Sequence, residues 1–222
     1  MKLIRQKIVS NFQIYELSES RIEQEKNLAK RLGIGDKIKF TLGDAFQAEQ
    51  DKGKFDFVHW NNSLHHMFDV DLAISWSYFV LKQGGMFYMD DYVGYKHMQY
   101  SEKMLEIASH ARSILPESFL VNPRNPEKLV SRVCKRPDLE KLVESEPSEC
   151  ADSERIIGCV QKYFPDAVVK LTGGVIYRLA LSDIIHNFDE DRDKHILNLL
   201  MMIDRFCIEK GETHYGIAIA IK

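Results

Sequence analysis

Short apolar stretches that end in polar residues recur along the first 92 positions and predict the strands of a sheet. They cover residues 12–17, 37–42, 54–60 and 86–89. Helical spacing separates them: Ser18 can cap a helix that runs to Gly33, and apolar positions from Asp71 to Leu81 form one face of another, stopped by two glycines at 84 and 85. Strand and helix therefore alternate through this part of the chain.

The alternation breaks at Val93. Residues 100–115 predict an amphipathic helix, and a charged segment that holds five of the six prolines follows it. Strand and helix then return, as a helix from 152 or 153 to 164, a strand at 168–171, a turn or bulge at 173–174, a long helix at 191–210 and a last strand at 214–221. We interpret residues 93–151 as an insert over the edge of the sheet.

Strands joined by helix-sized connections pair in parallel, because parallel neighbours need a long crossover. The sequence therefore predicts an α/β fold with a mostly parallel sheet. We expect three regions. Residues 1–92 form the cofactor-side half of the domain, residues 93–151 form a helical and proline-rich insert that acts as a substrate lid, and residues 152–222 complete the same domain.

The composition narrows the class of protein. With 222 residues, 45% of them hydrophobic and 28% charged, the chain can bury one full-sized core, which argues against a disordered or fibrous protein. Its formal net charge of -3 at pH 7 gives no basic excess that would follow a phosphate backbone. We therefore expect a small-molecule partner and not a nucleic acid.

Nothing in the pattern predicts a membrane span or an export signal. The longest apolar runs, such as residues 217–221, are much shorter than a bilayer-spanning helix, and residues 1–9 mix basic with apolar positions. The four cysteines, at positions 134, 150, 159 and 207, lack the close spacing of a zinc site or a redox pair. We expect a cytoplasmic protein with reduced, buried thiols and no dedicated metal site.

Hydrogen-bonding side chains follow four of the predicted strands. They are Glu16, Asp44, Asn61 with Asn62, and Asp90 with Asp91. Ligands of an open parallel sheet bind beyond the carboxyl ends of its strands, so these side chains are candidate ligand contacts. A carboxylate at the end of the second strand of such a sheet has two acceptor oxygens for the two hydroxyls of a ribose, and Glu16 suits that role.

Four segments resemble class I S-adenosylmethionine-dependent methyltransferases. In chain order they are YELSES, GDAF, FDFVHWNNSLHHM and LKQGGMFYMDD. Each is weak evidence alone, but the order and spacing are fairly specific, and the likeness extends from Phe12 to the last strand. The resemblance implies a Rossmann-like sheet that closes with a reversed C-terminal hairpin, and S-adenosyl-L-methionine as the cofactor.

The resemblance also implies roles for single residues. Glu16 would hold the ribose, and Asn61 would face the methionine part of the cofactor. Asp44 would accept a hydrogen bond from the adenine amino group, with Ala45 and Phe46 beside the ring. The purely structural alternatives are an acid at a helix N-terminus for Glu16 and an ordinary turn aspartate for Asp44.

One expected element is missing. The family's signature is an earlier strand with a glycine-rich loop after it, and the eleven residues before Phe12 contain no glycine. In the family's sheet that strand lies between those predicted at 12–17 and 54–60, so its loss leaves two ladders unpaired. Either the biological protein begins upstream of Met1, or residues 1–9 or a partner chain replace the strand.

Candidate catalytic residues follow the strands at 54–60 and 86–89. Methyl transfer requires alignment of donor and acceptor, and a base where the acceptor is poorly nucleophilic. His65 and His66 can supply that base, or can instead pack beside the cofactor or cap the next helix. Asp90, Asp91 and Tyr92 form the acceptor side just before the insert. No ligand spacing among these residues predicts a metal site.

Two arginines are candidate substrate contacts. Arg124, in the turn-rich segment NPRNP, and Arg178 can hold an anionic acceptor if the insert covers the site. We therefore expect methyl transfer to a small polar acceptor, such as a sugar, a nucleotide-linked intermediate or another anionic metabolite.

Three alternatives remain open. They are a methyltransferase-like binding protein without catalysis, a truncated form of a longer enzyme, and a dinucleotide oxidoreductase. The last also needs a glycine fingerprint and leaves the segments GDAF and NNSLHH unexplained. The exposed faces of the helices at 100–115 and 191–210 are candidate surfaces for a homodimer.

Overall fold

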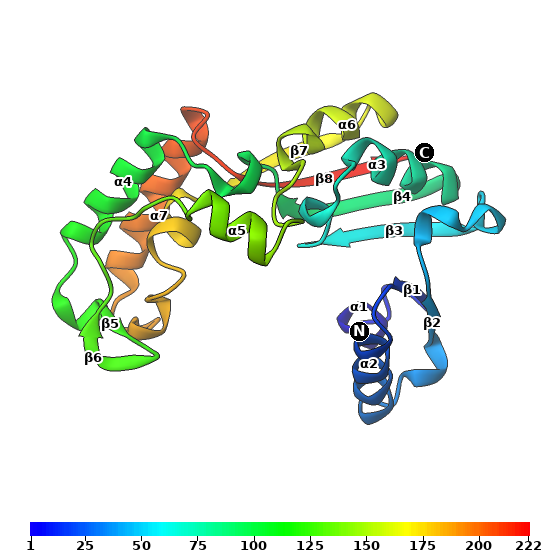
Figure 1. Ribbon diagram of the computed structural model, residues 1–222, viewed down its shortest axis with the longest axis horizontal. Helices are drawn as coiled ribbons and strands as arrows, with labels where there is room; N and C mark the ends of the chain where they lie inside the picture. Colours follow the sequence, from blue (N-terminus) through cyan, green and yellow to red (C-terminus); the bar gives the residue numbers. More distant parts are fainter. The chain divides into compact units, whose positions relative to one another are not determined.

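Two units make up the chain, which the computed structural model describes over residues 1–222. They are Met1–Asp51 and Lys52–Lys222. In the smaller unit, β1 (Phe12–Glu16) and β2 (Ile38–Leu42) pair in parallel, and α2 (Glu19–Arg31) connects them (Figure 1). A short helix, α1 (Lys2–Arg5), precedes them. The predicted regions, with boundaries at 92 and 151, stay a prediction.

Local signals that the sequence predicted set the bounds of α2. Ser18 Oγ accepts a hydrogen bond from the backbone N–H of Arg21 at 3.4 Å and caps the helix, and Gly33 follows its end with a left-handed φ of +67°. The helix buries Ala29 against Ile34 and Ile38, so this unit has a small core of its own.

The larger unit contains a four-stranded sheet. Its order is β3 (Phe55–Asn61), β4 (Leu81–Tyr92), β8 (Tyr215–Ile221) and β7 (Val168–Gly173). β3 and β4 are parallel, whereas β8 runs antiparallel to both of its neighbours. With the parallel β1–β2 pair, this confirms the predicted α/β fold with a reversed C-terminal hairpin.

Helices α3 (Val70–Val80) and α6 (Ile156–Tyr163) lie on one face of this sheet (Figure 1). Asp69 caps α3, and Phe87 of β4 stacks on Phe164 just after α6. Because α3 runs directly into β4, the strand begins earlier than the predicted residue 86. Gly84, with φ of +78°, lies within this early part of the strand, where the pairing register with β3 shifts.

A group of helices lies at one end of the sheet. Its members are α4 (Glu102–Ser113), α5 (Leu139–Ser145) and α7 (Lys194–Glu209), with a π-helix at Val175–Ala180 and a hairpin of β5 (Val121–Asn122) and β6 (Asn125–Leu129). The predicted helices at 100–115 and 191–210 are confirmed as α4 and α7. The π-helix packs against both, and its buried residues join a core that includes Tyr92 of the sheet.

A buried carboxylate explains the π-helix, which the sequence did not predict. Asp204 of α7 accepts hydrogen bonds from the backbone N–H groups of Gly174, at 3.2 Å, and of Ile176, at 2.9 Å. These groups start the π-helix and would otherwise be buried without a partner. Gly174 has φ of +118°, and a β-carbon there would lie 2.6 Å from Nε2 of His214.

Short 3₁₀ turns connect the main elements. They are Gly35–Lys37, Ala45–Gln47, Glu49–Asp51, Leu64–His66, Lys96–Met98, Glu117–Phe119, Ser153–Arg155 and Ile185–Asn187. None of the helices is both long and apolar enough to span a membrane.

Candidate active site

The smaller unit places Glu16 at the carboxyl end of β1, as predicted. The backbone N–H of Gly43 donates to the carbonyl oxygen of Glu16 at 3.1 Å, so the ends of β1 and β2 lie side by side. Oε1 of Glu16 accepts from the backbone N–H of Ser18 at 2.9 Å, and Oε2 lies 3.9 Å from Arg21. The half-buried carboxylate therefore anchors the start of α2 and also offers an oxygen at the strand end.

Asp44 lies at the same edge of this unit. Its Oδ1 accepts from the backbone N–H of Phe46 at 2.9 Å and starts the 3₁₀ turn at Ala45–Gln47. Asp44 is exposed, and Ala45 and Phe46 are half-buried. The structure thus brings Glu16 together with the GDAF segment, and the cofactor roles of these four residues stay predictions.

In the larger unit, the carboxylate of Asp91 organises the strand ends. It is fully buried and accepts backbone hydrogen bonds from Ser63 and Leu64 at 2.8 Å, His65 at 3.3 Å and Tyr92 at 2.9 Å. These donors compensate the burial of the charge, and they fix the loop after β3 onto the end of β4.

The fifth donor to Asp91 is the imidazole of His65. Nδ1 of His65 lies 2.5 Å from Oδ1 of Asp91, and the ring is buried. Because a carboxylate only accepts hydrogen bonds, we assign the proton to Nδ1, which leaves a lone pair on Nε2. His65 therefore has the tautomer and fixed orientation that a proton acceptor needs.

The insert contributes Glu149 and Cys150 to the same place. Oε1 of Glu149 lies 3.8 Å from Nε2 of His65, and the thiol of Cys150 donates to that oxygen at 3.2 Å. Oε2 of Glu149 lies 3.7 Å from Nε2 of His66, whose Nδ1 is 3.4 Å from the hydroxyl of Ser148. Both predicted histidines therefore face the insert.

The other predicted residues of these strand ends have different environments. Asn61 is exposed and pairs in register with Asp90, which is half-buried. Burial, with the nearby charge of Asp91, raises the pKa of the Asp90 carboxyl. Tyr92 is buried, its hydroxyl donates to the carbonyl of Tyr95 at 3.0 Å, and burial raises its pKa far above the ordinary value. The Tyr92 hydroxyl is therefore already bonded to the Tyr95 backbone, and the catalytic role of Tyr92 stays a prediction.

Arg178, on the π-helix, is exposed and forms no ion pair. Its charge acts on buried groups near the strand ends: burial raises the pKa of the Tyr100 and Tyr215 hydroxyls, and the Arg178 charge partly opposes this. Burial also raises the pKa of the Cys150 thiol, and the Arg178 charge partly opposes this too. Arg178 is therefore an exposed cation whose charge reaches the buried Tyr100 hydroxyl and the Cys150 thiol.

Arg124 is not part of this group. It lies in the turn of the β5–β6 hairpin, at the end of the helical group that is farther from the sheet, and its side chain is exposed (Figure 1). Its backbone N–H donates to Asn122 Oδ1 at 2.9 Å. The substrate role of Arg124 stays a prediction, and we leave it out of the function that we propose.

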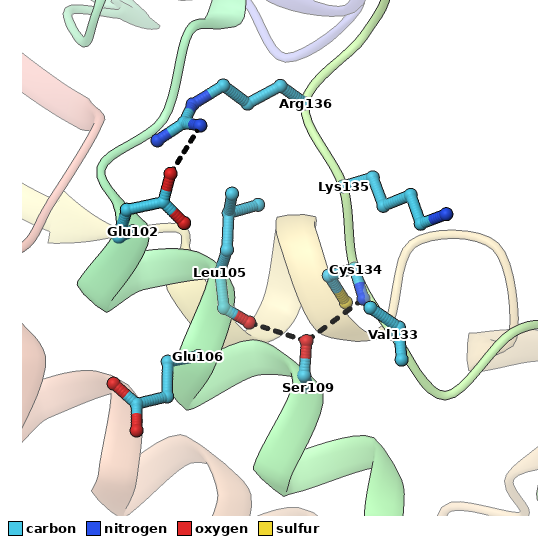
Figure 2. Close-up of a pocket in the computed structure, with 8 residues that line it drawn as sticks. All are labelled: Glu102, Leu105, Glu106, Ser109, Val133, Cys134, Lys135 and Arg136. Atoms are coloured by element: carbon cyan, nitrogen blue, oxygen red, sulfur yellow. Dashed lines mark hydrogen bonds and ion pairs between the residues drawn. The ribbon is translucent and has the colours of Figure 1, made fainter.

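The cavity in Figure 2 is also separate from the strand ends. It has a volume of about 380 Å³ and lies between α4 and residues 133–136. The polar groups that line it are hydrogen-bonded to one another. Arg136 pairs with Glu102 at 2.6 Å, and Ser109 Oγ donates to the carbonyl of Leu105 and accepts from the backbone N–H of Cys134. We assign no chemistry to this cavity.

No local sequence pattern identifies Glu149 and Cys150 as site residues. They lie more than eighty residues after His65 in the chain, within a charged segment that has no regular spacing to the histidines. The prediction that the cysteines are free and buried is confirmed. The only available signal was that the insert was expected to cover the strand ends, which did not identify single residues.

A known family includes most of the chain. The profile described as "Methyltransferase domain" matches residues 6–154, more than half of the sequence. The chain belongs to this methyltransferase family. The predicted family is therefore confirmed. In sequence, no curated protein matches the chain significantly.

Solved structures of methyltransferases share the fold at low sequence identity. Two structures of phosphoethanolamine N-methyltransferase 2 from Haemonchus contortus match all of this chain and 46% and 45% of theirs, at 14% and 15% identity and TM-scores of 0.57 and 0.58. Geranyl diphosphate C-methyltransferase from Streptomyces coelicolor matches 99% of this chain and 66% of its own, at 10% identity and a TM-score of 0.53. The chain thus spans less than half the length of the first two.

Proposed function

We propose that this methyltransferase-family chain carries the catalytic residues of an S-adenosylmethionine-dependent enzyme that methylates a small, phosphate-bearing acceptor. The main observation is that Asp91 accepts from Nδ1 of the buried His65, which fixes the ring and leaves Nε2 without a proton. The comparisons support the cofactor, because the two related structures contain S-adenosylhomocysteine and S-adenosyl-L-methionine. Their acceptors, phosphomonomethylethanolamine and geranyl diphosphate, both carry phosphate.

The strand ends of the smaller unit suit the nucleoside part of this cofactor. Glu16 has a carboxylate oxygen that accepts no backbone hydrogen bond, as a ribose hydroxyl requires, and Asp44 is exposed beside the half-buried ring of Phe46. When bound, the cofactor supplies a methyl group on a positively charged sulfur.

His65 is the proton acceptor in this proposal. The acceptor's oxygen or nitrogen forms the new bond to the methyl carbon, the bond from that carbon to sulfur breaks, and the proton passes to Nε2 of His65. Asp91 stabilises the imidazolium that results, because its carboxylate already accepts from Nδ1. The negative charge of Glu149, 3.8 Å from Nε2, acts in the same direction.

Arg178 is the anchor for the phosphate. It is exposed and unpaired, so a phosphate that pairs with its guanidinium breaks no existing ion pair. The Tyr100 and Tyr215 hydroxyls, on which the Arg178 charge acts, have raised pKa values and so stay neutral donors. This arrangement favours an anionic acceptor over an uncharged one.

Two measurements test the proposal. Calorimetric titration with S-adenosyl-L-methionine tests the cofactor. Transfer of a labelled methyl group to phosphorylated amines and alcohols, and to the same compounds without phosphate, tests the acceptor. We expect His65→Ala to reduce kcat by about 100-fold or more and Arg178→Ala to raise KM for the phosphorylated compounds only.

Arg124→Ala is the matched control, since it removes an exposed guanidinium away from the site. Cofactor binding without methyl transfer to any acceptor would favour the alternative of a non-catalytic binding protein. Equal rates with and without phosphate would overturn the anionic acceptor.

A further inference from the structure

We propose that His65, Glu149 and Cys150 form a binding site for a divalent transition metal ion, with zinc as the best match. No close sequence spacing identifies such a site, because the insert carries two of the ligands and the loop after β3 carries the third. The donor atoms are Nε2 of His65, a carboxylate oxygen of Glu149 and Sγ of Cys150, and they all lie within 4.8 Å of one another.

The distances suit one ion. Oε1 of Glu149 is 3.8 Å from Nε2 of His65 and 3.2 Å from Sγ of Cys150. A zinc ion with bonds of about 2.0 Å to nitrogen and oxygen and about 2.3 Å to sulfur holds its tetrahedral ligand atoms roughly 3 to 4 Å apart. Small side-chain adjustments are therefore sufficient to coordinate it.

The groups around the ligands already have the arrangement of a metal site. Asp91 accepts from Nδ1 of His65 at 2.5 Å, and this directs the lone pair of Nε2 toward Glu149. His97 fixes the other two ligands: its backbone N–H donates to the carbonyl of Cys150 at 2.9 Å, and its Nδ1 donates to that of Glu149 at 2.8 Å.

The charge balance also favours a cation. The Glu149 side chain is 13% exposed, and its ion-pair partners are the two histidines rather than a lysine or arginine. Cys150 is completely buried beside it. A half-buried carboxylate next to a thiol and imidazoles is stabilised by a positive charge beside it. A metal ion supplies that charge and takes the thiol as thiolate.

The ligand types select the metal. One thiolate, one imidazole and one carboxylate suit zinc, whereas magnesium and calcium prefer oxygen ligands alone. A second group, His66, Glu146 and Glu149, shares the central carboxylate but lacks a thiol and is more exposed. We therefore place the ion in the group that contains Cys150. Three protein ligands leave a fourth position open for water or a ligand group.

A consequence rests on the proposed function. Nε2 of His65 cannot hold a metal ion and accept a proton from the acceptor at the same time, so the ion inhibits methyl transfer. Binding of the ion itself does not depend on that function and is measured without cofactor or acceptor.

Cobalt(II) titration of the purified protein tests the site, because cobalt reports thiolate ligation through its near-ultraviolet charge-transfer absorption. We expect one equivalent of cobalt to produce this absorption and zinc to displace it. Cys150→Ser abolishes the absorption, and Glu149→Gln weakens zinc binding by about 10-fold or more. Cys159→Ser is the matched control, since it removes another buried thiol outside the cluster and leaves the absorption intact.

His66→Ala distinguishes the proposed site from the second group, His66, Glu146 and Glu149, because it removes a ligand of the second group only. This variant should retain the absorption. Circular dichroism melting of each variant shows whether it is folded. The inference is wrong if the folded protein with reduced cysteines shows no charge-transfer absorption, or if the absorption survives in Cys150→Ser. Either result leaves cofactor binding and methyl transfer untouched, so the two proposals fail separately.

Discussion

His65 and Asp91 form a buried pair in which Nδ1 and Oδ1 are 2.5 Å apart. The same carboxylate accepts from four backbone N–H groups, three of them in the loop that carries His65. The aspartate therefore positions the loop and the imidazole together. Substitution of Asp91 should therefore affect both the stability of the loop and the proton transfer that we propose for His65.

Asp91→Asn should reduce both the stability of the protein and the rate of methyl transfer. An amide has one acceptor oxygen instead of two, so it leaves buried donors unpaired, and we expect the free energy of unfolding to fall by about 2 to 3 kcal/mol. Methyl transfer should fall by about 10- to 100-fold, because the imidazole loses the acceptor that fixes its tautomer. Urea denaturation and initial rates at saturating cofactor measure the two effects. Asp90→Asn is the control and should leave stability nearly unchanged, while equal behaviour of both variants would contradict this account.

Replacement by alanine should lower the free energy of unfolding at Gly94 and raise it at Gly158. A β-carbon at Gly94 would lie 2.3 Å from Cβ of His214, so the backbone or the histidine must move, and we expect a loss of about 2 to 3 kcal/mol in the free energy of unfolding. Gly158 lies within α6 with open space around it, so alanine there should add about 0.5 to 1 kcal/mol. Thermal melts of both variants check this. A stabilised Gly94→Ala protein would show that the contact is not as close as described.

The elements that the sequence predicted well are those with local signals. α2 begins after the Ser18 cap and is followed by Gly33, and α3 buries positions 70, 73, 74, 77 and 80 at helical spacing. The polar strand ends at Glu16, Asp44 and Asp91 were visible because each follows a short apolar stretch. Local patterns therefore located the edge of each sheet where a ligand is expected.

The elements that it did not predict depend on contacts distant in the sequence. The π-helix at Val175–Ala180 starts on backbone N–H groups that Asp204 accepts from, and no local pattern specifies this. Glu149 lies beside His65 although the two are far apart in the sequence, and no local pattern specifies that contact. Sequence alone gave Asp90 and Asp91 the same role, whereas one is half-buried and the other is the centre of the hydrogen-bond network.

Arg112 should be a major source of stability in the helical group. It is 5% exposed, and its guanidinium donates to the carbonyls of Ala180 at 2.7 Å and Ser131 at 2.9 Å, and pairs with Asp183. Arg112→Met leaves these carbonyls without a donor, so we expect the free energy of unfolding to fall by about 3 kcal/mol or more.

Arg124→Met provides the comparison for Arg112→Met in urea denaturation, because its exposed side chain should contribute less than about 0.5 kcal/mol. If Arg112→Met unfolds at the same urea concentration as Arg124→Met, the buried hydrogen bonds of Arg112 contribute no net stability.

His214 should make the protein less stable in mild acid. Burial, together with the charge of Arg178, lowers its pKa to about 4, whereas an unfolded histidine has a pKa near 6.5. Between these values only the unfolded chain takes up the proton, so the free energy of unfolding falls as the pH drops. The total contribution is about 3 kcal/mol, of which about 2 kcal/mol is lost by pH 5.

Urea denaturation at pH 7.5 and pH 5 measures this loss, and His214→Phe should remove it, because phenylalanine fills the space among Tyr92, Tyr100 and Tyr215 without a titrating group. His186→Phe, at an exposed histidine, should keep the full pH dependence of the unmodified protein. The assignment to His214 is wrong if His214→Phe loses as much stability between the two pH values as the unmodified protein does. If only the unmodified protein and His186→Phe lose stability at pH 5, the acid sensitivity lies at His214, where β8 meets Tyr92 and Tyr100.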